Sequence, residues 1–128
     1  MWEEFLNWIK LKFKIQQNTY RTLFKEGEVW WANLGQNIGD EENGKGVNYM
    51  RPAIVIKKYN RNLCLIVPTS SQIKENKYYF KIKYNGQYYS ALVSQLRTVD
   101  SKRFRKKIAE LPKKELADLK QYILLQTF

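Results

Sequence analysis

The sequence contains no histidine and only one cysteine, Cys64. Without histidine, the chain cannot use a serine or cysteine nucleophile that a histidine activates, nor cleave RNA with a pair of histidines. The same absence excludes a zinc site built from the usual cysteine and histidine ligands. Asp40, Glu41 and Glu42 are adjacent, whereas phosphate-transfer sites that use Mg²⁺ normally draw carboxylates from separate segments. We therefore expect neither a metal nor a cofactor.

Acidic residues are also scarce. The chain has 12 aspartates and glutamates against 23 lysines and arginines, which gives a formal net charge of +11. A balance this uneven in 128 residues produces a positive field over the surface and favours a polyanionic partner. Nucleic acid is the partner we expect, and an acidic protein fits the same charge.

The sequence has no apolar run of the roughly 20 residues that a membrane-spanning helix needs. Its start carries Glu3 and Glu4 where a signal peptide would have positive charge, so we expect neither secretion nor membrane insertion. Cys64 lies within the apolar run 63–67 and is interpreted as a buried small hydrophobe. A reducing cytoplasm suits that interpretation.

The length allows one domain with a modest core, and the apolar pattern divides the chain into an extension over 1–24 and a domain over 25–128. In the extension, helical spacing predicts an amphipathic helix across residues 2–16 that packs on the domain. Its apolar stripe consists of Trp2, Phe5, Leu6, Ile9 and Phe13.

From residue 28 onward the pattern changes to short β-type runs separated by Asn and Gly, which is typical of small barrels and sandwiches. Asn85 and Gly86 form a tight-turn pair between two of these runs. Pro112 begins a C-terminal helix that ends near Gln126. We predict strands near 28–34, 52–59, 63–68, 77–84, 87–93 and 96–99.

Two places concentrate groups suited to phosphate chemistry without a cofactor. Arg51 precedes Pro52, whose ring favours an extended backbone at residue 51 and places the guanidinium at a strand entrance. Thr69, Ser70 and Ser71 follow Pro68 at a strand exit. Taken separately, a strand-end arginine is usually solvated, and hydroxyls after a strand usually bond nearby backbone amides.

Taken together and in order, five segments resemble the MazF/PemK toxin family. They are Gly27–Gly35, Gly39–Glu42, Arg51–Ile56, Val67–Ser71 and Ser94–Asp100. The resemblance implies an α+β, mainly β fold: a small SH3-like barrel of the MazF/CcdB type with a C-terminal helix, to which this chain adds its N-terminal helix. It also implies a cytoplasmic homodimer that cuts single-stranded RNA, commonly messenger RNA, at short motifs, and that an acidic antitoxin neutralises.

By the same resemblance, Arg51 matches the family's catalytic arginine, and Ser70 stands where the family usually has a catalytic threonine. Glu41 matches a glutamate of the first loop that is implicated in activity in some members. Thr69, Ser71 and Gln95 are the expected substrate-binding residues. RNA would then be cut by attack of its own 2′-hydroxyl, which leaves a 2′,3′-cyclic phosphate and a 5′-hydroxyl.

Two alternatives remain open. A gyrase poison like CcdB would share the barrel but act by binding a protein and leave RNA intact. A non-catalytic nucleic-acid-binding barrel would need only the basic charge.

Overall fold

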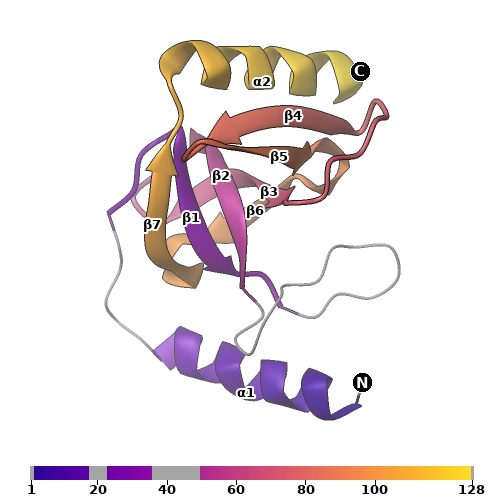
Figure 1. Ribbon diagram of the computed structural model, residues 1–128. Helices are drawn as coiled ribbons and strands as arrows, with labels where there is room; N and C mark the ends of the chain where they lie inside the picture. The colour runs from indigo at the N-terminus through magenta and orange to yellow at the C-terminus, as the bar shows by residue number, and fades with distance from the viewer. Residues whose placement is uncertain (1, 18–22, 36–49, 128) are drawn as a thin grey trace.

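The computed structural model describes residues 2–17, 23–35 and 50–127 (Figure 1). Two helices lie at the ends of the described chain, with strands and two short 3-10 helices between them. In chain order the elements are α1 (Trp2–Gln17), β1 (Glu28–Asn33), β2 (Met50–Lys58), β3 (Leu63–Ser70), β4 (Tyr79–Tyr84), β5 (Gln87–Leu92), η1 (Val93–Gln95), β6 (Arg97–Asp100), η2 (Ser101–Arg103), β7 (Phe104–Glu110) and α2 (Lys113–Thr127).

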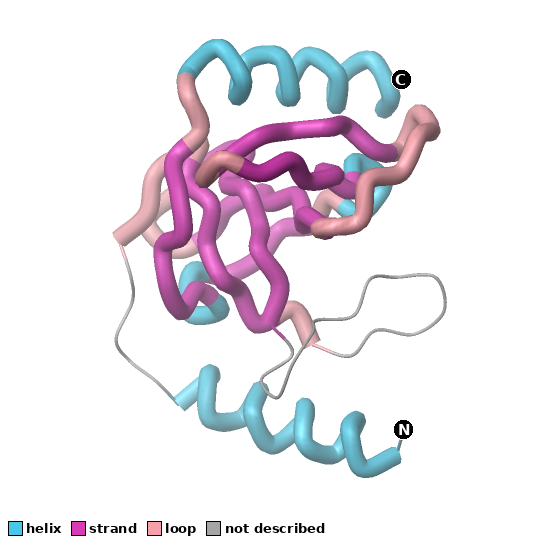
Figure 2. Tube along the Cα trace, in the orientation of Figure 1, coloured by secondary structure: helices cyan, strands magenta, loops and turns pink. Residues whose placement is uncertain are grey.

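The strands form one antiparallel, strongly curved sheet (Figure 2). Its order is β4-β5-β3-β2-β1-β7, and β6 pairs with β3. The strand β3 therefore joins the two halves, because one end pairs with β6 and the other with β5. The helices α1 and α2 lie at opposite ends of the barrel (Figure 1). The expected α+β, mainly β fold with two terminal helices is confirmed.

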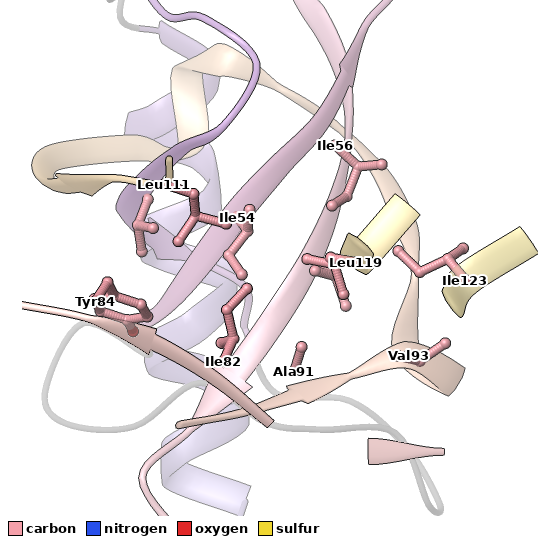
Figure 3. Packing of buried hydrophobic residues seen from close by; sticks show 11 residues of the cluster. Ile54, Ile56, Ile82, Tyr84, Ala91, Val93, Leu111, Leu119 and Ile123 are labelled. Atoms are coloured by element: carbon pink, nitrogen blue, oxygen red, sulfur yellow. The ribbon is translucent and has the colours of Figure 1, made fainter. Parts of the chain in front are cut away.

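Buried side chains form two main clusters, one on each face of β2. Ile54 and Ile56 point toward α2 and meet Leu119 and Ile123 from that helix (Figure 3). Ala53 and Val55, one residue out of phase, join the second cluster around Phe104, whose ring stacks on Trp30 at 5.5 Å. Because neighbouring side chains of a strand point to opposite faces, a continuous apolar run indicates a strand buried on both sides.

The six predicted strands and the C-terminal helix are all present, with bounds that differ by at most two residues. The alternation across the predicted strand 77–84 places Tyr78 on the same core face as Phe80, but β4 begins at Tyr79 and Tyr78 is 46% exposed. The seventh strand, β7, was not predicted. Arg105 to Lys107 interrupt its alternation with three consecutive basic residues, and the strand pairs with β1 through two register shifts.

A buried carboxylate joins β1 to β7. Glu28 is 4% exposed, forms an ion pair of 2.9 Å with Lys107 Nζ, and accepts hydrogen bonds from the Lys25 backbone N–H and from Trp30 Nε1. Burial raises the pKa of Glu28, but these three bonds outweigh it and hold the pKa below its ordinary value. The ionised carboxylate is thus a structural group at the start of the barrel.

The predicted helix over 2–16 is confirmed, but the prediction of its packing face was wrong. Trp8 is 8% exposed and Leu11 packs beside it, whereas Trp2, Leu6 and Ile9 of the predicted stripe are exposed. Gly35 explains why Trp8 is the buried residue of the helix. It has a φ of +82°, and a side chain there would collide with the Trp8 indole. Within the described ranges, neither helix is long and apolar enough to cross a membrane.

Trp8→Ala is expected to release α1 while leaving the barrel folded, because burial of an indole contributes roughly 2–3 kcal/mol and this one holds the helix. Limited trypsin digestion should then cut faster at Lys10 and Lys12, with little change in the thermal midpoint of the barrel. Trp2→Ala is the matched control, because Trp2 is 71% exposed. Equal digestion rates in wild type and Trp8→Ala would show that Trp8 does not anchor the helix.

Candidate active site

Arg51 is a buried cation near the start of β2. Its side chain is only 4% exposed, and its Nη1 donates a hydrogen bond of 3.2 Å to the Thr69 carbonyl oxygen. The residue pairs with Ala32 of β1 and stands two positions before Ala53 on the same face of the strand. Burying a charge is costly unless polar groups surround it, so a buried guanidinium at a strand end marks a place built for polar contact.

The register between β2 and β3 brings the end of β3 close to this cation. Near the connecting turn Lys58 lies opposite Cys64, but a bulge between Val55 and Lys57 shifts the register by one residue, so that Ala53 lies opposite Pro68. Ala53–Pro68 is the last pair at this end of the two strands; continued by two residues, the shifted register would set Arg51 opposite Ser70, and the Arg51 hydrogen bond to the Thr69 carbonyl oxygen shows that its side chain reaches this part of β3. Cross-strand neighbours on one face have Cβ atoms about 5 Å apart. Without the bulge, Arg51 would face Ser71.

Arg51 and Ser70 open into one cavity of about 210 Å³. Among the described residues that line it, Arg51 alone carries a charge, so the cavity selects for an anion. Its volume is below the several hundred Å³ typical of pockets for drug-sized ligands and suits one phosphodiester of a chain that continues outside. The lining residues are Trp31, Met50, Arg51, Pro52, Thr69, Ser70, Ser71, Tyr84, Tyr89 and Ile108.

Thr69 and Tyr84 form a hydrogen-bonded wall of the cavity. The Thr69 hydroxyl lies 3.0 Å from the Tyr84 hydroxyl and 3.3 Å from the Pro52 carbonyl oxygen. Burial raises the pKa of Tyr84 to about 12, although the bond with Thr69 lowers it in part. The ring of Tyr89 stacks on the Tyr84 ring, with the two centroids 4.1 Å apart, and completes this wall. Thr69 is 1% exposed, and its hydroxyl contacts both Tyr84 and Pro52.

The structure brings some of the predicted site residues together. Arg51, Thr69, Ser70 and Ser71 line the cavity, and Ser70 Oγ also accepts a hydrogen bond from the Gln72 N–H at 3.2 Å. Gln95 lies in η1 and is not among the lining residues. Glu41 lies outside the residues that the structure describes. The roles assigned to all of these residues stay predictions.

Sequence reasoning missed the aromatic lining. Trp31 is 36% exposed and lies at the cavity, while its neighbour Trp30 is buried in the core. A signal was available, because two consecutive tryptophans in a strand must point to opposite faces and only one can join the same cluster. The sequence places Tyr89 in the predicted strand 87–93 but does not indicate which face of the sheet its side chain lies on.

Cys64 is fully buried, as predicted, and burial raises the pKa of its thiol to about 12. The thiol therefore stays protonated and is a poor nucleophile at neutral pH. In the part of the chain that the structure describes, no three histidine, cysteine or acidic residues gather where they could hold a metal ion.

Solved structures with the same architecture identify the fold class. MazF from Deinococcus radiodurans superposes with a TM-score of 0.64 at 21% identity, over 84% of this chain and 99% of that one. A MazE-MazF complex from the same organism superposes with a TM-score of 0.63 at 20% identity, over 83% of this chain and 96% of that one. An endoribonuclease bound to its cognate antitoxin, from a mycobacterial species, superposes with a TM-score of 0.60 at 8% identity, over 80% of this chain and 92% of that one. The chain thus has the MazF-type fold.

A family model described as "PemK-like, MazF-like toxin of type II toxin-antitoxin system" matches residues 25–127. The chain belongs to this family, and the resemblance found in the five sequence segments is confirmed. No curated protein matches it significantly. The division of the chain at residues 24 and 25 stays a prediction.

Tyr84→Phe is expected to flatten the loss of stability at high pH. In the folded protein Tyr84 keeps its proton up to a pKa of about 12, whereas the unfolded chain loses it near 10, so stability is retained below pH 10 and falls as pH rises toward 12. The phenylalanine variant lacks this fall of roughly 3 kcal/mol, which urea titrations across that range would measure. A fall of equal size in both proteins would contradict the assignment.

Proposed function

We propose that the protein is an endoribonuclease toxin that cuts single-stranded RNA at specific short sequences. The observation that carries the proposal is the buried guanidinium of Arg51, which lines a small cavity together with Ser70 and is the only charged group among the described lining residues. Membership in the toxin family and the net charge of +11 support the same conclusion. One solved structure with this fold is itself named an endoribonuclease.

The proposed reaction needs only groups of the RNA and of the chain. The 2′-oxygen loses its proton and attacks the adjacent phosphorus, the bond from phosphorus to the 5′-oxygen breaks, and that oxygen gains a proton. Arg51 contacts the phosphoryl oxygens and stabilises the charge of the pentavalent transition state. Ser70 donates a hydrogen bond to the same group, and Glu41 acts as the base or positions its loop. The products are a 2′,3′-cyclic phosphate and a 5′-hydroxyl.

We also propose that Trp31, which lines the cavity, stacks on a base of the RNA. Its partly exposed indole lies at the cavity that holds Arg51, where a base next to the scissile phosphate can stack on it. Stacking on an aromatic ring is worth about 1–3 kcal/mol per base and is available to every base. This contact therefore orients the strand without selecting a base.

The remaining parts of the proposal concern assembly and place. We expect a homodimer in the cytoplasm, where messenger RNA is the substrate, with no metal ion required. An acidic antitoxin neutralises the enzyme, and the positive surface provides the complementary charge. Solved MazE-MazF complexes with this fold support an antitoxin partner.

Purified protein incubated in EDTA with a long single-stranded RNA is expected to give fragments with 5′-hydroxyl ends, and Arg51→Ala is expected to slow cleavage by about 10²–10³-fold, because a transition-state contact is lost. Rates of labelled-fragment formation provide the measurement. Arg61→Ala is the matched control, because Arg61 is exposed and lies at the turn end of the same hairpin. Cleavage at the wild-type rate by Arg51→Ala would remove this residue from the mechanism.

Ser70 is tested by a pair of substitutions. Ser70→Ala should slow cleavage because the hydroxyl is lost, whereas Ser70→Thr should retain activity because it keeps the hydroxyl and restricts its rotamer. Equal rates in all three proteins would assign Ser70 to the turn alone, where it accepts from the Gln72 N–H. RNA left intact by wild type, with gyrase inhibited, would support the poison instead, and retention without cutting would support the binding barrel.

A further inference from the structure

A second concentration of positive charge lies outside the cavity, on the β4–β5 hairpin and the segment before it. Residues 71–90 contain four lysines, five tyrosines and a single acidic residue, Glu75. Several of these lysines lie over tyrosine rings. We define the lysine–tyrosine face as Lys74, Tyr79, Lys81, Lys83 and Tyr88.

The rings and the ammonium groups of this face are ordered against one another. Lys81 Nζ lies 4.4 Å from the centroid of the Tyr88 ring, and Lys83 Nζ lies 5.3 Å from the same centroid. Tyr88 is nonetheless 53% exposed. A solvent-exposed ring with two ammonium groups close to it can stack with a nucleobase while the lysines contact the flanking phosphates.

The sheet register connects this face to the candidate active site. Ser70 on β3 lies opposite Ser90 on β5, and Ser90 lies opposite Lys81 on β4. Paired residues share one face of the sheet, so Lys81 is two strand spacings, or about 10 Å, from Ser70 on that face. A few nucleotides span such a distance.

Lys74 lies beside the row formed by Ser70, Ser90 and Lys81. Its backbone N–H donates a hydrogen bond of 3.2 Å to Ser90 Oγ, which places the segment after β3 over the middle of the row. Its ammonium group lies 5.1 Å from the centroid of the Tyr79 ring. Positive charge therefore continues from the cavity edge at Ser71 to Lys83.

The opposite border of the face is acidic. A hollow of about 240 Å³ between the hairpin and α2 is lined by Lys81, Lys83 and Tyr88 on one side and by Glu115 and Asp118 on the other. Carboxylates repel phosphates, so a polyanion bound at the lysines is directed away from α2 and toward Ser70.

We propose that the lysine–tyrosine face is a binding track for the RNA strand that flanks the cleaved phosphodiester. The inference rests on the proposed ribonuclease function and deepens it, because it assigns residues that hold the substrate without taking part in the chemical step. Nucleotides on the track gain contacts that are equal in the ground state and in the transition state. Such contacts lower KM and leave kcat unchanged.

The test compares two lengths of RNA that share one mapped cleavage site: a strand of about 12 nucleotides and a dinucleotide that spans only the scissile bond. For the long strand, Tyr88→Ala and the double variant Lys81→Gln/Lys83→Gln are each expected to raise KM about tenfold with kcat within about twofold of wild type. For the dinucleotide, both variants should equal wild type. Tyr88→Phe should behave as wild type, because it keeps the stacking face.

The double variant Lys113→Gln/Lys114→Gln is the charge-matched control, because it removes two exposed lysines at the start of α2. If wild type cleaves but the track variants match it on the long strand, the track is refuted while the proposed function stands. If wild type does not cleave, the proposed function fails, and fluorescence anisotropy with the same labelled strand decides the track. Equal affinity of wild type and Tyr88→Ala would refute it, and at least several-fold weaker affinity would support it.

Discussion

The site depends on the register between β2 and β3. Ile54 and Val67 face one hydrophobic cluster, while Ala53, Val55 and Ile66 face the other. A slip of one residue would turn all of these side chains to the wrong face and would carry the Arg51 guanidinium into the apolar layer beneath α2. The apolar pattern that stabilises the barrel therefore also fixes where the buried cation lies. Core packing and site geometry are a single constraint in this chain.

The sequence was sufficient for the fold but not for the pairing within the site. Short β-type runs separated by Asn and Gly predicted six strands, because such residues suit a pleated, at least half-buried surface. The position of Arg51 relative to β3 depends on a bulge between Val55 and Lys57, and nothing in the local sequence indicates that bulge. Counting from the turn would pair Arg51 with Ser71. The family resemblance selected Ser70 where local reasoning had no means to do so.

The errors have a shared physical cause, since a pattern describes one segment and its packing partner decides the outcome. In α1, Trp2, Leu6 and Ile9 of the apolar stripe with the best spacing stay exposed, while Trp8 packs against a glycine that leaves room for an indole. In β7 three consecutive basic residues conceal a strand whose stability comes from pairing with β1 and from the ion pair of Lys107 with Glu28. In neither segment is the partner visible in the local sequence.

Two physically different kinds of cation serve the proposed function. The guanidinium of Arg51 lies in a water-poor environment, where a charge interacts strongly with a nearby phosphate and is held in place before the reaction begins. The lysines of the hairpin are exposed, so solvent and salt weaken each contact and their effect is on binding. A surface cation cannot replace the buried one, because water screens it. A second buried cation would add a further desolvation cost without a second phosphate to offset it.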